Sequence, residues 1–106
     1  MPSIEKNGIK IEVNEDGFMS EPGEWNPAIA LILAEAEEHI DTLTDEHWAV
    51  VHYIRTYYEE NNLAPMVRKM CQNTGFSLKR IYELFPSGPA KGACKVAGLP
   101  KPDGCV

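Results

Sequence analysis

The sequence predicts a mainly α-helical domain with a small N-terminal β-hairpin and a flexible C-terminal arm. Its 106 residues are enough for one domain with a single core. Apolar residues recur at helical spacing over most of residues 26–85. The composition changes after residue 85, since residues 86–106 contain four prolines and four glycines. A short helix over residues 90–97 is expected there, and no regular structure after Gly98. We therefore expect residues 1–97 to form the domain and residues 98–106 to form the mobile arm.

Residues 3–13 are predicted to form the hairpin. Asn7-Gly8 favours a tight two-residue turn, because both residue types tolerate positive φ. The apolar residues after this turn alternate with charged ones, and they are Ile9, Ile11 and Val13. An isolated hairpin is marginal in water, so we expect this one to pack on helices.

The first two predicted helices begin at strong capping residues. Asn26 and Thr44 are preferred N-cap residues, and Pro27 suits the first helical position. The first helix has an apolar stripe that consists of Ile29, Ile32, Leu33, Ala36 and Ile40. The second helix ends at Asn61-Asn62, and its stripe consists of Trp48, Val51, Ile54, Tyr58 and the stem of Arg55. Such stripes predict helices that each bury one face.

Residues 65–74 and 78–85 are predicted to form a pair that resembles a helix-turn-helix. Gly75 ends the first helix of the pair, and Ser77 caps the second. The apolar positions of the second helix are Leu78, Ile81, Tyr82 and Phe85. The basic residues near the pair are Arg68, Lys69, Lys79 and Arg80. The pair allows two interpretations, a DNA-binding module and a corner used only for packing. The net charge of −6 argues against DNA as the partner.

Charge is divided unevenly along the chain. Residues 1–63 contain three basic and fourteen acidic residues, whereas residues 64–106 contain seven basic and two acidic ones. The first part therefore carries a formal charge of −11 and the second a charge of +5. This asymmetry predicts a partner, either a protein or a nucleic acid, that contacts the C-terminal third.

The composition also indicates the cellular compartment. No apolar run approaches the roughly 18 residues of a membrane span, and the N-terminus lacks the basic and apolar regions of an export signal. Three cysteines are too few for a disulfide framework. We therefore expect a cytoplasmic protein that does not itself enter the membrane.

Two of the cysteines are the main candidates for chemistry. Cys94 lies on a short helix predicted over residues 90–97, and Cys105 is the penultimate residue. The segment between them can extend by about 36–40 Å, and it can also fold back so that the two sulfurs meet. We interpret Cys105 as a swinging thiol and Cys94 as the resolving thiol at its base. The alternative is a pair of ordinary surface thiols.

Charged residues near these cysteines are expected to influence their acidity. The lysines Lys91, Lys95 and Lys101 are predicted to lower the thiolate pKa values, because a nearby positive charge stabilises the thiolate. Asp103 and the terminal carboxylate oppose this effect at Cys105. We therefore expect Cys105 to be accessible rather than strongly acidic.

The remaining candidate residues predict no further chemistry. Cys71 follows Val67 by one helical turn, so we expect it to be buried as a small apolar residue. His39, His47 and His52 do not have the spacing of a metal site. The chain has no phosphate-binding loop and no dinucleotide fingerprint. We expect no metal site, no cofactor and no catalysis by this chain alone.

Several motifs resemble the DsrC/TusE/RspA family. They are Leu63-Ala-Pro-Met-Val-Arg68, Asn73-Thr-Gly-Phe76, Tyr82-Glu-Leu-Phe-Pro-Ser-Gly-Pro89 and Lys91-Gly-Ala-Cys-Lys-Val-Ala-Gly-Leu-Pro-Lys-Pro-Asp-Gly-Cys-Val106. Asp16-Gly-Phe18 and Thr44-Asp-Glu-His-Trp48 extend the resemblance over nearly the whole chain. Members with only the penultimate cysteine are similar to TusE, a sulfur relay in tRNA 2-thiouridine synthesis. Members with both Cys94 and Cys105 equivalents form the DsrC branch, which this chain resembles.

The resemblance implies a sulfur carrier that serves as co-substrate of dissimilatory sulfite reductase and is often called its gamma subunit. Cys105 would meet a sulfur intermediate at the siroheme of the catalytic subunits, and Cys94 would then close a trisulfide. A membrane-bound thiol/disulfide redox complex would reduce that product. In sulfur oxidisers, relay proteins would instead load Cys105 as a persulfide. The siroheme and iron–sulfur clusters would belong to the partner.

The resemblance also implies which residues contact the partner, and it leaves alternatives open. The expected contact residues are Lys91, Lys95, Lys101, Pro102 and Gly104. Asp103 departs from the threonine that is more common in the family. A TusE-like relay and a helix-turn-helix DNA-binding regulator are the alternative functions. The sequence does not fix the direction of sulfur flow, the oligomeric state, or whether the arm is docked in isolation.

Overall fold

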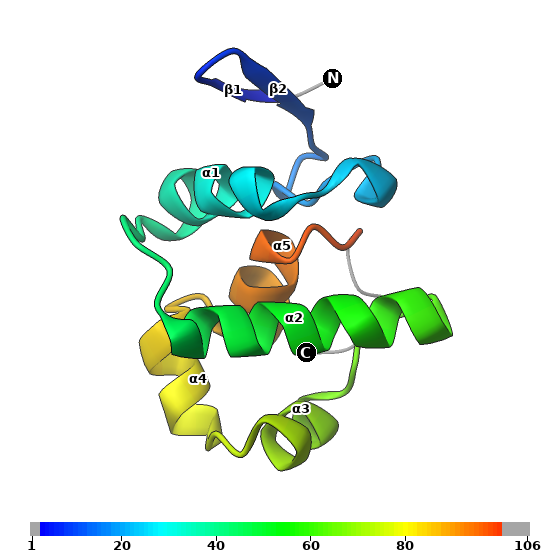
Figure 1. Cartoon of the computed structure of the whole chain (residues 1–106), viewed down its shortest axis with the longest axis vertical. Helices are drawn as coiled ribbons and strands as arrows, with labels where there is room; N and C mark the ends of the chain where they lie inside the picture. Colours follow the sequence, from blue (N-terminus) through cyan, green and yellow to red (C-terminus); the bar gives the residue numbers. More distant parts are fainter. Residues whose placement is uncertain (1–2, 101–106) are drawn as a thin grey trace.

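The N-terminal residues form the predicted hairpin. In the computed structural model, which describes residues 3–100, strand β1 (Ser3–Lys6) pairs antiparallel with β2 (Ile9–Glu12), and Ile4 is opposite Ile11. Asn7 and Gly8 adopt φ values of 53° and 80°, as the two-residue turn requires. The hairpin lies at one end of the long axis of the molecule (Figure 1).

The hairpin packs on helix α1 (Pro27–Glu38), which follows the short 3-10 helix η1 (Pro22–Glu24). The side chain of Asn26 caps α1 by accepting a hydrogen bond from the Ile29 N–H at 3.0 Å. A small apolar cluster joins the hairpin to α1, and it contains Ile11, Val13, Met19, Ile29, Ile32 and Leu33. The helix is shorter than the predicted stripe, because His39 adopts φ 57° and ends it. Ala36, predicted to be on the buried stripe, is exposed.

Helix α2 (Asp45–Asn61) is the longest element and begins with a reciprocal cap. The Thr44 hydroxyl accepts from the His47 N–H at 3.4 Å, and His47 Nδ1 accepts from the Thr44 N–H at 3.0 Å. Its fully buried residues are Val50, Val51 and Ile54, while Trp48 and Tyr58 are half-buried. The predicted stripe is therefore confirmed in position, with its aromatic residues at the edge of the core.

Helices α3 (Val67–Thr74) and α4 (Leu78–Leu84) form the predicted pair at the end of the molecule opposite the hairpin (Figure 1). Gly75 joins them with φ 80°, and the Ser77 hydroxyl accepts from the Arg80 N–H at 3.1 Å. Only part of the predicted stripe on α4 faces the core. Leu78 and Tyr82 are exposed, so that prediction is wrong for these two residues.

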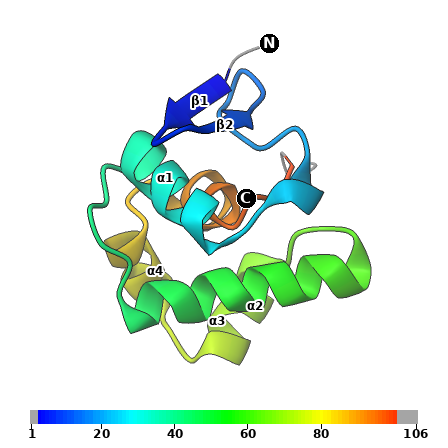
Figure 2. The ribbon, with the colours of Figure 1, turned by 45° about the horizontal axis from the view of Figure 1, so that its top comes forward.

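The last described elements occupy the centre of the molecule. The π-helix η2 (Pro89–Ala93) leads directly into α5 (Cys94–Val96). Figures 1 and 2 both show α5 between α1 and α2. The buried core residues of this segment include Ala93, Cys94, Val96, Ala97 and Leu99. The short helix predicted over residues 90–97 is thus present, although it begins one residue earlier and with π-helical geometry.

This central position corrects one expectation. Packing continues past the expected start of the arm at residue 98, because Leu99 is fully buried. Within residues 3–100, no helix has both the length and the apolar character that crossing a membrane requires.

Candidate functional site

Cys94 is the candidate thiol that the structure describes, and it is buried. Its residue is only 2 % exposed and belongs to the main apolar cluster between α1 and α2. Burial raises the pKa of the Cys94 thiol to about 12, because the apolar surroundings disfavour the thiolate. Cys94 is therefore protonated at neutral pH, and its conversion to a thiolate requires its sulfur to leave these apolar surroundings.

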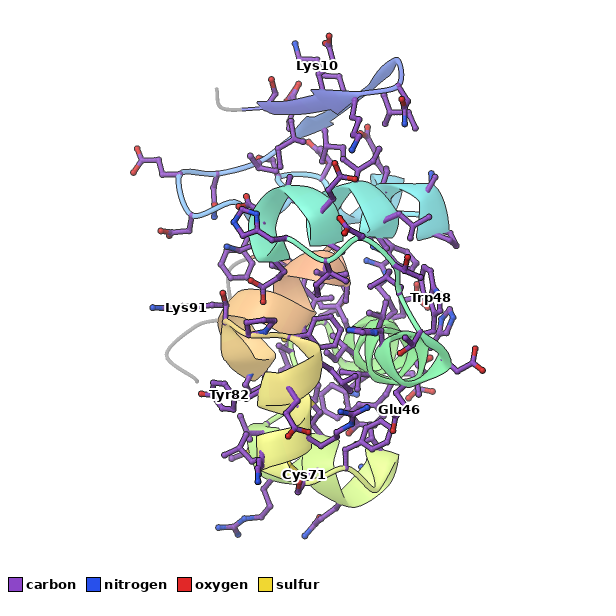
Figure 3. All side chains as sticks on the ribbon, turned by 90° about the vertical axis from the view of Figure 1, so that its left-hand side faces the viewer. Lys10, Glu46, Trp48, Cys71, Tyr82 and Lys91 are labelled. Carbon is purple, nitrogen blue, oxygen red and sulfur yellow. The ribbon has the colours of Figure 1, made fainter. Side chains whose placement is uncertain are left out.

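Lys91 and Lys95 do not lower the pKa of Cys94, which corrects the prediction made from their spacing for these two lysines. The Lys95 ammonium lies 5.2 Å from the centroid of the Phe18 ring, a cation–π contact with the loop that follows the hairpin. Lys91 is exposed, and its side chain extends away from the body in Figure 3. Burial thus outweighs the neighbouring charge at this thiol.

The chain around Cys94 is fixed by contacts from distant parts of the sequence. The Trp25 indole Nε1–H donates to the Val96 carbonyl at 3.0 Å. Arg55 Nη1 donates to the Ala97 carbonyl at 3.4 Å and to the Pro22 carbonyl at 3.2 Å. Sequence reasoning missed Trp25 and Arg55 as site residues. Arg55 carried one signal, since it is a basic residue on the apolar stripe of an otherwise acidic half.

A buried carboxylate supports the segment that leads into Cys94. Glu38, at the end of α1, accepts hydrogen bonds from the Ser87 N–H at 3.0 Å and the Ser87 hydroxyl at 2.6 Å. A Cβ atom on Gly92 would overlap the Glu38 carboxylate, so η2 can approach α1 closely only with glycine at this position. Glu38 therefore holds the start of η2 against α1.

The other sequence candidates lie apart from Cys94 or have structural roles. Cys71 is half-buried on α3, at the far end from the hairpin in Figure 3, and it packs against the main apolar cluster, so the expectation that it is buried is confirmed in part. His47 Nε2 donates to the Leu84 carbonyl at 2.8 Å and joins α2 to α4. In the part of the chain that the structure describes, no three His, Cys, Asp or Glu side chains converge as a metal site requires. The expected absence of a metal stays a prediction.

The helix-turn-helix-like pair presents less positive charge than its sequence suggests. The Arg80 guanidinium pairs with the Glu46 carboxylate and lies 3.2 Å from Glu83 Oε1. The Lys69 ammonium lies 6.0 Å from the centroid of the Tyr57 ring. Arg80 is therefore engaged in ion pairs within the protein, which weakens the DNA-binding interpretation.

Four of the predicted site residues fall outside residues 3–100. They are Lys101, Pro102, Gly104 and Cys105. The structure thus places Cys94, Lys91 and Lys95, and the roles predicted for the other four stay predictions.

Comparison with known proteins gives a consistent result over the whole chain. The family described as "DsrC like protein" matches residues 5–106. The chain is 47% identical over 106 residues to "Sulfite reductase, dissimilatory-type subunit gamma" of Nitratidesulfovibrio vulgaris, and the match covers 100% of both chains. It is 43% identical over 107 residues to "Sulfurtransferase TusE" of Photorhabdus laumondii, covering 93% of this chain and 94% of that protein.

The chain is also similar to proteins whose structures have been solved. One is a chain in the crystal structure of dissimilatory sulfite reductase I, with a TM-score of 0.90 and 48% sequence identity. That match covers 99% of this chain and 100% of the other. The mainly helical fold with a small hairpin, predicted from the sequence, is therefore confirmed by similarity as well as by the structure itself.

Proposed function

The chain belongs to the DsrC family, and we propose that it is a sulfur carrier and co-substrate of dissimilatory sulfite reductase. One observation supports this most directly. This chain is 47% identical to a gamma subunit of that reductase. It has one cysteine at the penultimate position and a second at the start of the same C-terminal segment. These are Cys105 and Cys94, the two thiols that such a carrier requires.

In the proposed reaction, Cys105 takes up the sulfur and Cys94 closes onto it. Sulfite accepts two electrons from the partner's donor and two from the pair of cysteine thiols. With four protons taken up, the products are a trisulfide between Cys94 and Cys105 and three molecules of water. A separate reductant then supplies four electrons and four protons, which returns both thiols and releases hydrogen sulfide. Thiol–disulfide chemistry of this kind needs an accessible attacking thiol and a second thiol that resolves the product.

The burial of Cys94 supports this order of events. A thiol whose pKa is raised to about 12 is almost entirely protonated at neutral pH and reacts slowly. Cys105 would therefore bond to sulfur first, and Cys94 would attack only once its sulfur leaves its apolar surroundings. Keeping the resolving thiol protonated until then would prevent premature closure of the pair.

The proposed partners follow from the family and the charge distribution. The catalytic subunits of the reductase would hold the siroheme and iron–sulfur clusters, and a membrane-bound thiol/disulfide complex would reduce the trisulfide. Lys91, which is exposed, would contact the catalytic subunits together with Lys101, Pro102 and Gly104. Lys95 would contribute less, because its ammonium lies on the Phe18 ring. A cytoplasmic location and the absence of catalysis by this chain alone stay predictions.

A TusE-like sulfur relay is the second candidate, because the chain is 43% identical to a TusE protein. Such a relay passes a persulfide from one thiol to the next protein and needs only Cys105. Sulfur-relay proteins would then be the partners, and tRNA thiolation the destination. The role of Cys94 separates the two candidates.

Single-cysteine variants test the proposal. After turnover with reductase catalytic subunits, sulfite and an electron donor, Cys105→Ala should carry no added sulfur. Cys94→Ala should hold sulfur on Cys105 without forming the internal trisulfide, and Cys71→Ala should behave as the wild type. A Cys94→Ala variant that turns over like the wild type would favour the relay. A Cys105→Ala variant that still takes up sulfur would refute both candidates.

A further inference from the structure

The chain reverses direction immediately after α5. Gly98 adopts φ 76°, its N–H donates to the Lys95 carbonyl at 3.0 Å, and the Leu99 N–H donates to the Cys94 carbonyl at 3.2 Å. These two bonds form a Schellman motif, the reversal that commonly ends a helix at glycine. Leu99 consequently lies beside Cys94, although it follows Cys94 by five positions in the sequence.

Two distant side chains complete this reversal. A helix end leaves four carbonyls without intrahelical partners, and the Schellman motif satisfies those of Cys94 and Lys95. The two that are left, on Val96 and Ala97, accept hydrogen bonds from Trp25 Nε1 at 3.0 Å and Arg55 Nη1 at 3.4 Å. All four carbonyls are therefore bonded, two of them by side chains outside the segment.

The reversal is also closely packed against these side chains. A Cβ atom on Gly98 would overlap the Trp25 ring and lie 2.9 Å from Met19 Sδ. The Arg55 guanidinium lies 4.8 Å from the centroid of the Trp25 ring, and the Arg55 side chain is only 11% exposed. The contacts fix both the path of the backbone and the position of Arg55.

We propose that Trp25, Arg55 and Gly98 form an arm anchor that holds the root of the C-terminal segment beside Cys94 and so promotes closure of the Cys94–Cys105 pair. The three are positioning residues, since they act through the backbone of residues 96–99 and not on sulfur. This inference rests on the proposed function, because it assigns a role in the two-cysteine chemistry.

Loop-closure entropy gives the size of the expected effect. Eleven residues follow Cys94 up to and including Cys105. With Leu99 fixed beside Cys94, only the six residues 100–105 must close the loop. The probability of closure falls as about the three-halves power of loop length, so the anchor raises the effective concentration of Cys105 at Cys94 by about 2.5-fold.

The anchor can be tested without the reductase, by equilibrating the protein with oxidised and reduced glutathione in a Cys71→Ala background. Cys105 attacks oxidised glutathione and releases one reduced glutathione, and Cys94 then attacks the mixed disulfide and releases a second. The ratio of closed protein to mixed disulfide gives the effective concentration of the pair. Mass spectrometry with cysteine mapping quantifies both species.

Trp25→Phe is the main variant, because it keeps an aromatic ring while it removes the indole N–H that bonds to Val96 and part of the ring that packs on Gly98. We expect its effective concentration to fall by about two- to threefold, as the loop-length argument requires. Gly98→Ala should reduce it at least as much. Trp48→Phe is the matched control, since Trp48 stacks on His52 within α2, and it should match the background protein.

The outcomes separate the anchor from the proposed function. If the background protein closes the disulfide and Trp25→Phe closes it with an unchanged or higher effective concentration, the anchor is overturned and the carrier stands. If the background protein forms no Cys94–Cys105 disulfide at all, the two-cysteine chemistry fails and the anchor fails with it. Should Gly98→Ala not fold, Trp25→Phe still decides the question.

Discussion

At the scale of single residues, burial rather than neighbouring charge determines the state of Cys94. Lys91 and Lys95 were predicted to lower the pKa of this thiol, yet burial raises it. Sequence spacing places charges near a residue but does not show which way their side chains turn. Lys95 illustrates this, because its ammonium reaches the Phe18 ring instead of the sulfur.

The alkylation rate of Cys94 checks its burial. In a Cys105→Ala background at pH 8, we expect iodoacetamide to modify Cys94 at least about tenfold more slowly than the half-buried Cys71, because a thiol with a pKa near 12 forms little thiolate. The Cys94 rate should rise with pH, and in denaturant the two cysteines should react alike. Equal rates in the native protein would contradict the burial of Cys94.

His47 gives the fold a pH dependence of defined sign. Burial lowers the pKa of His47 below its ordinary value of 6.5. Between pH 6.5 and this lowered pKa, the unfolded chain therefore binds more protons than the folded one. The stabilising contribution of neutral His47 is present above pH 6.5 and is lost below it. Protonation would also remove the hydrogen bond that Nδ1 accepts from the Thr44 N–H.

Urea denaturation between pH 5 and 8 tests this account of His47. We expect His47→Ala to lower the free energy of unfolding by about 2 kcal/mol at pH 7.5, since it removes a helix cap and a buried hydrogen bond. His47→Gln keeps a group able to complete the cap but cannot titrate. It should therefore lose less stability and remove part of the pH dependence. A His47→Gln variant with the full wild-type pH dependence would contradict the assignment.

At the scale of elements, local signals predicted the turns and caps but not the burial of residues 92–94 and 96–99. The turn at Asn7-Gly8 and the caps at Asn26 and Ser77 depend on neighbours in sequence, and all three formed as expected. The segment around α5 carries mostly small residues, which show no hydrophobic period. Its burial depends on close approach to α1 and α2, which only the assembled fold brings about.

The close approach of η2 to α1 predicts the effect of a single methyl group. Gly92→Ala should lower the free energy of unfolding by about 1–3 kcal/mol, because the added Cβ would overlap Glu38 and lie 3.0 Å from Phe85 Cβ. Gly23→Ala is the matched control, since no atom lies within 4 Å of its added Cβ. Urea denaturation measures both. Equal stabilities of the two variants would show that η2 is not tightly packed.

At the scale of the whole molecule, the root of the arm emerges from the central layer of the fold. The hairpin and the α3–α4 pair lie at opposite ends, with α5 between α1 and α2 (Figure 1). The acidic and basic parts of the sequence predicted a partner for the C-terminal third. The structure adds that the C-terminal segment packs into the core up to Leu99. A docked partner would therefore contact a segment whose position the core fixes.

Lys91 and Lys10 allow the charge argument to be tested on one molecule. Both are exposed, and Lys10 lies on the hairpin, far from Lys91 in Figure 3. We expect Lys91→Ala to weaken binding to the reductase catalytic subunits by about 2- to 10-fold, and the loss to shrink at high salt. Lys10→Ala should bind like the wild type. Equal effects of the two variants in a titration would show that the basic third does not direct docking.

The central claim is that the two cysteines carry one sulfur between them. Its most direct test is the intact mass of the wild-type protein, with cysteine mapping, after turnover with reductase catalytic subunits, sulfite and an electron donor. We expect one added sulfur atom and the loss of two hydrogens, with the extra sulfur bridging Cys94 and Cys105. Unmodified thiols after the same turnover would contradict it.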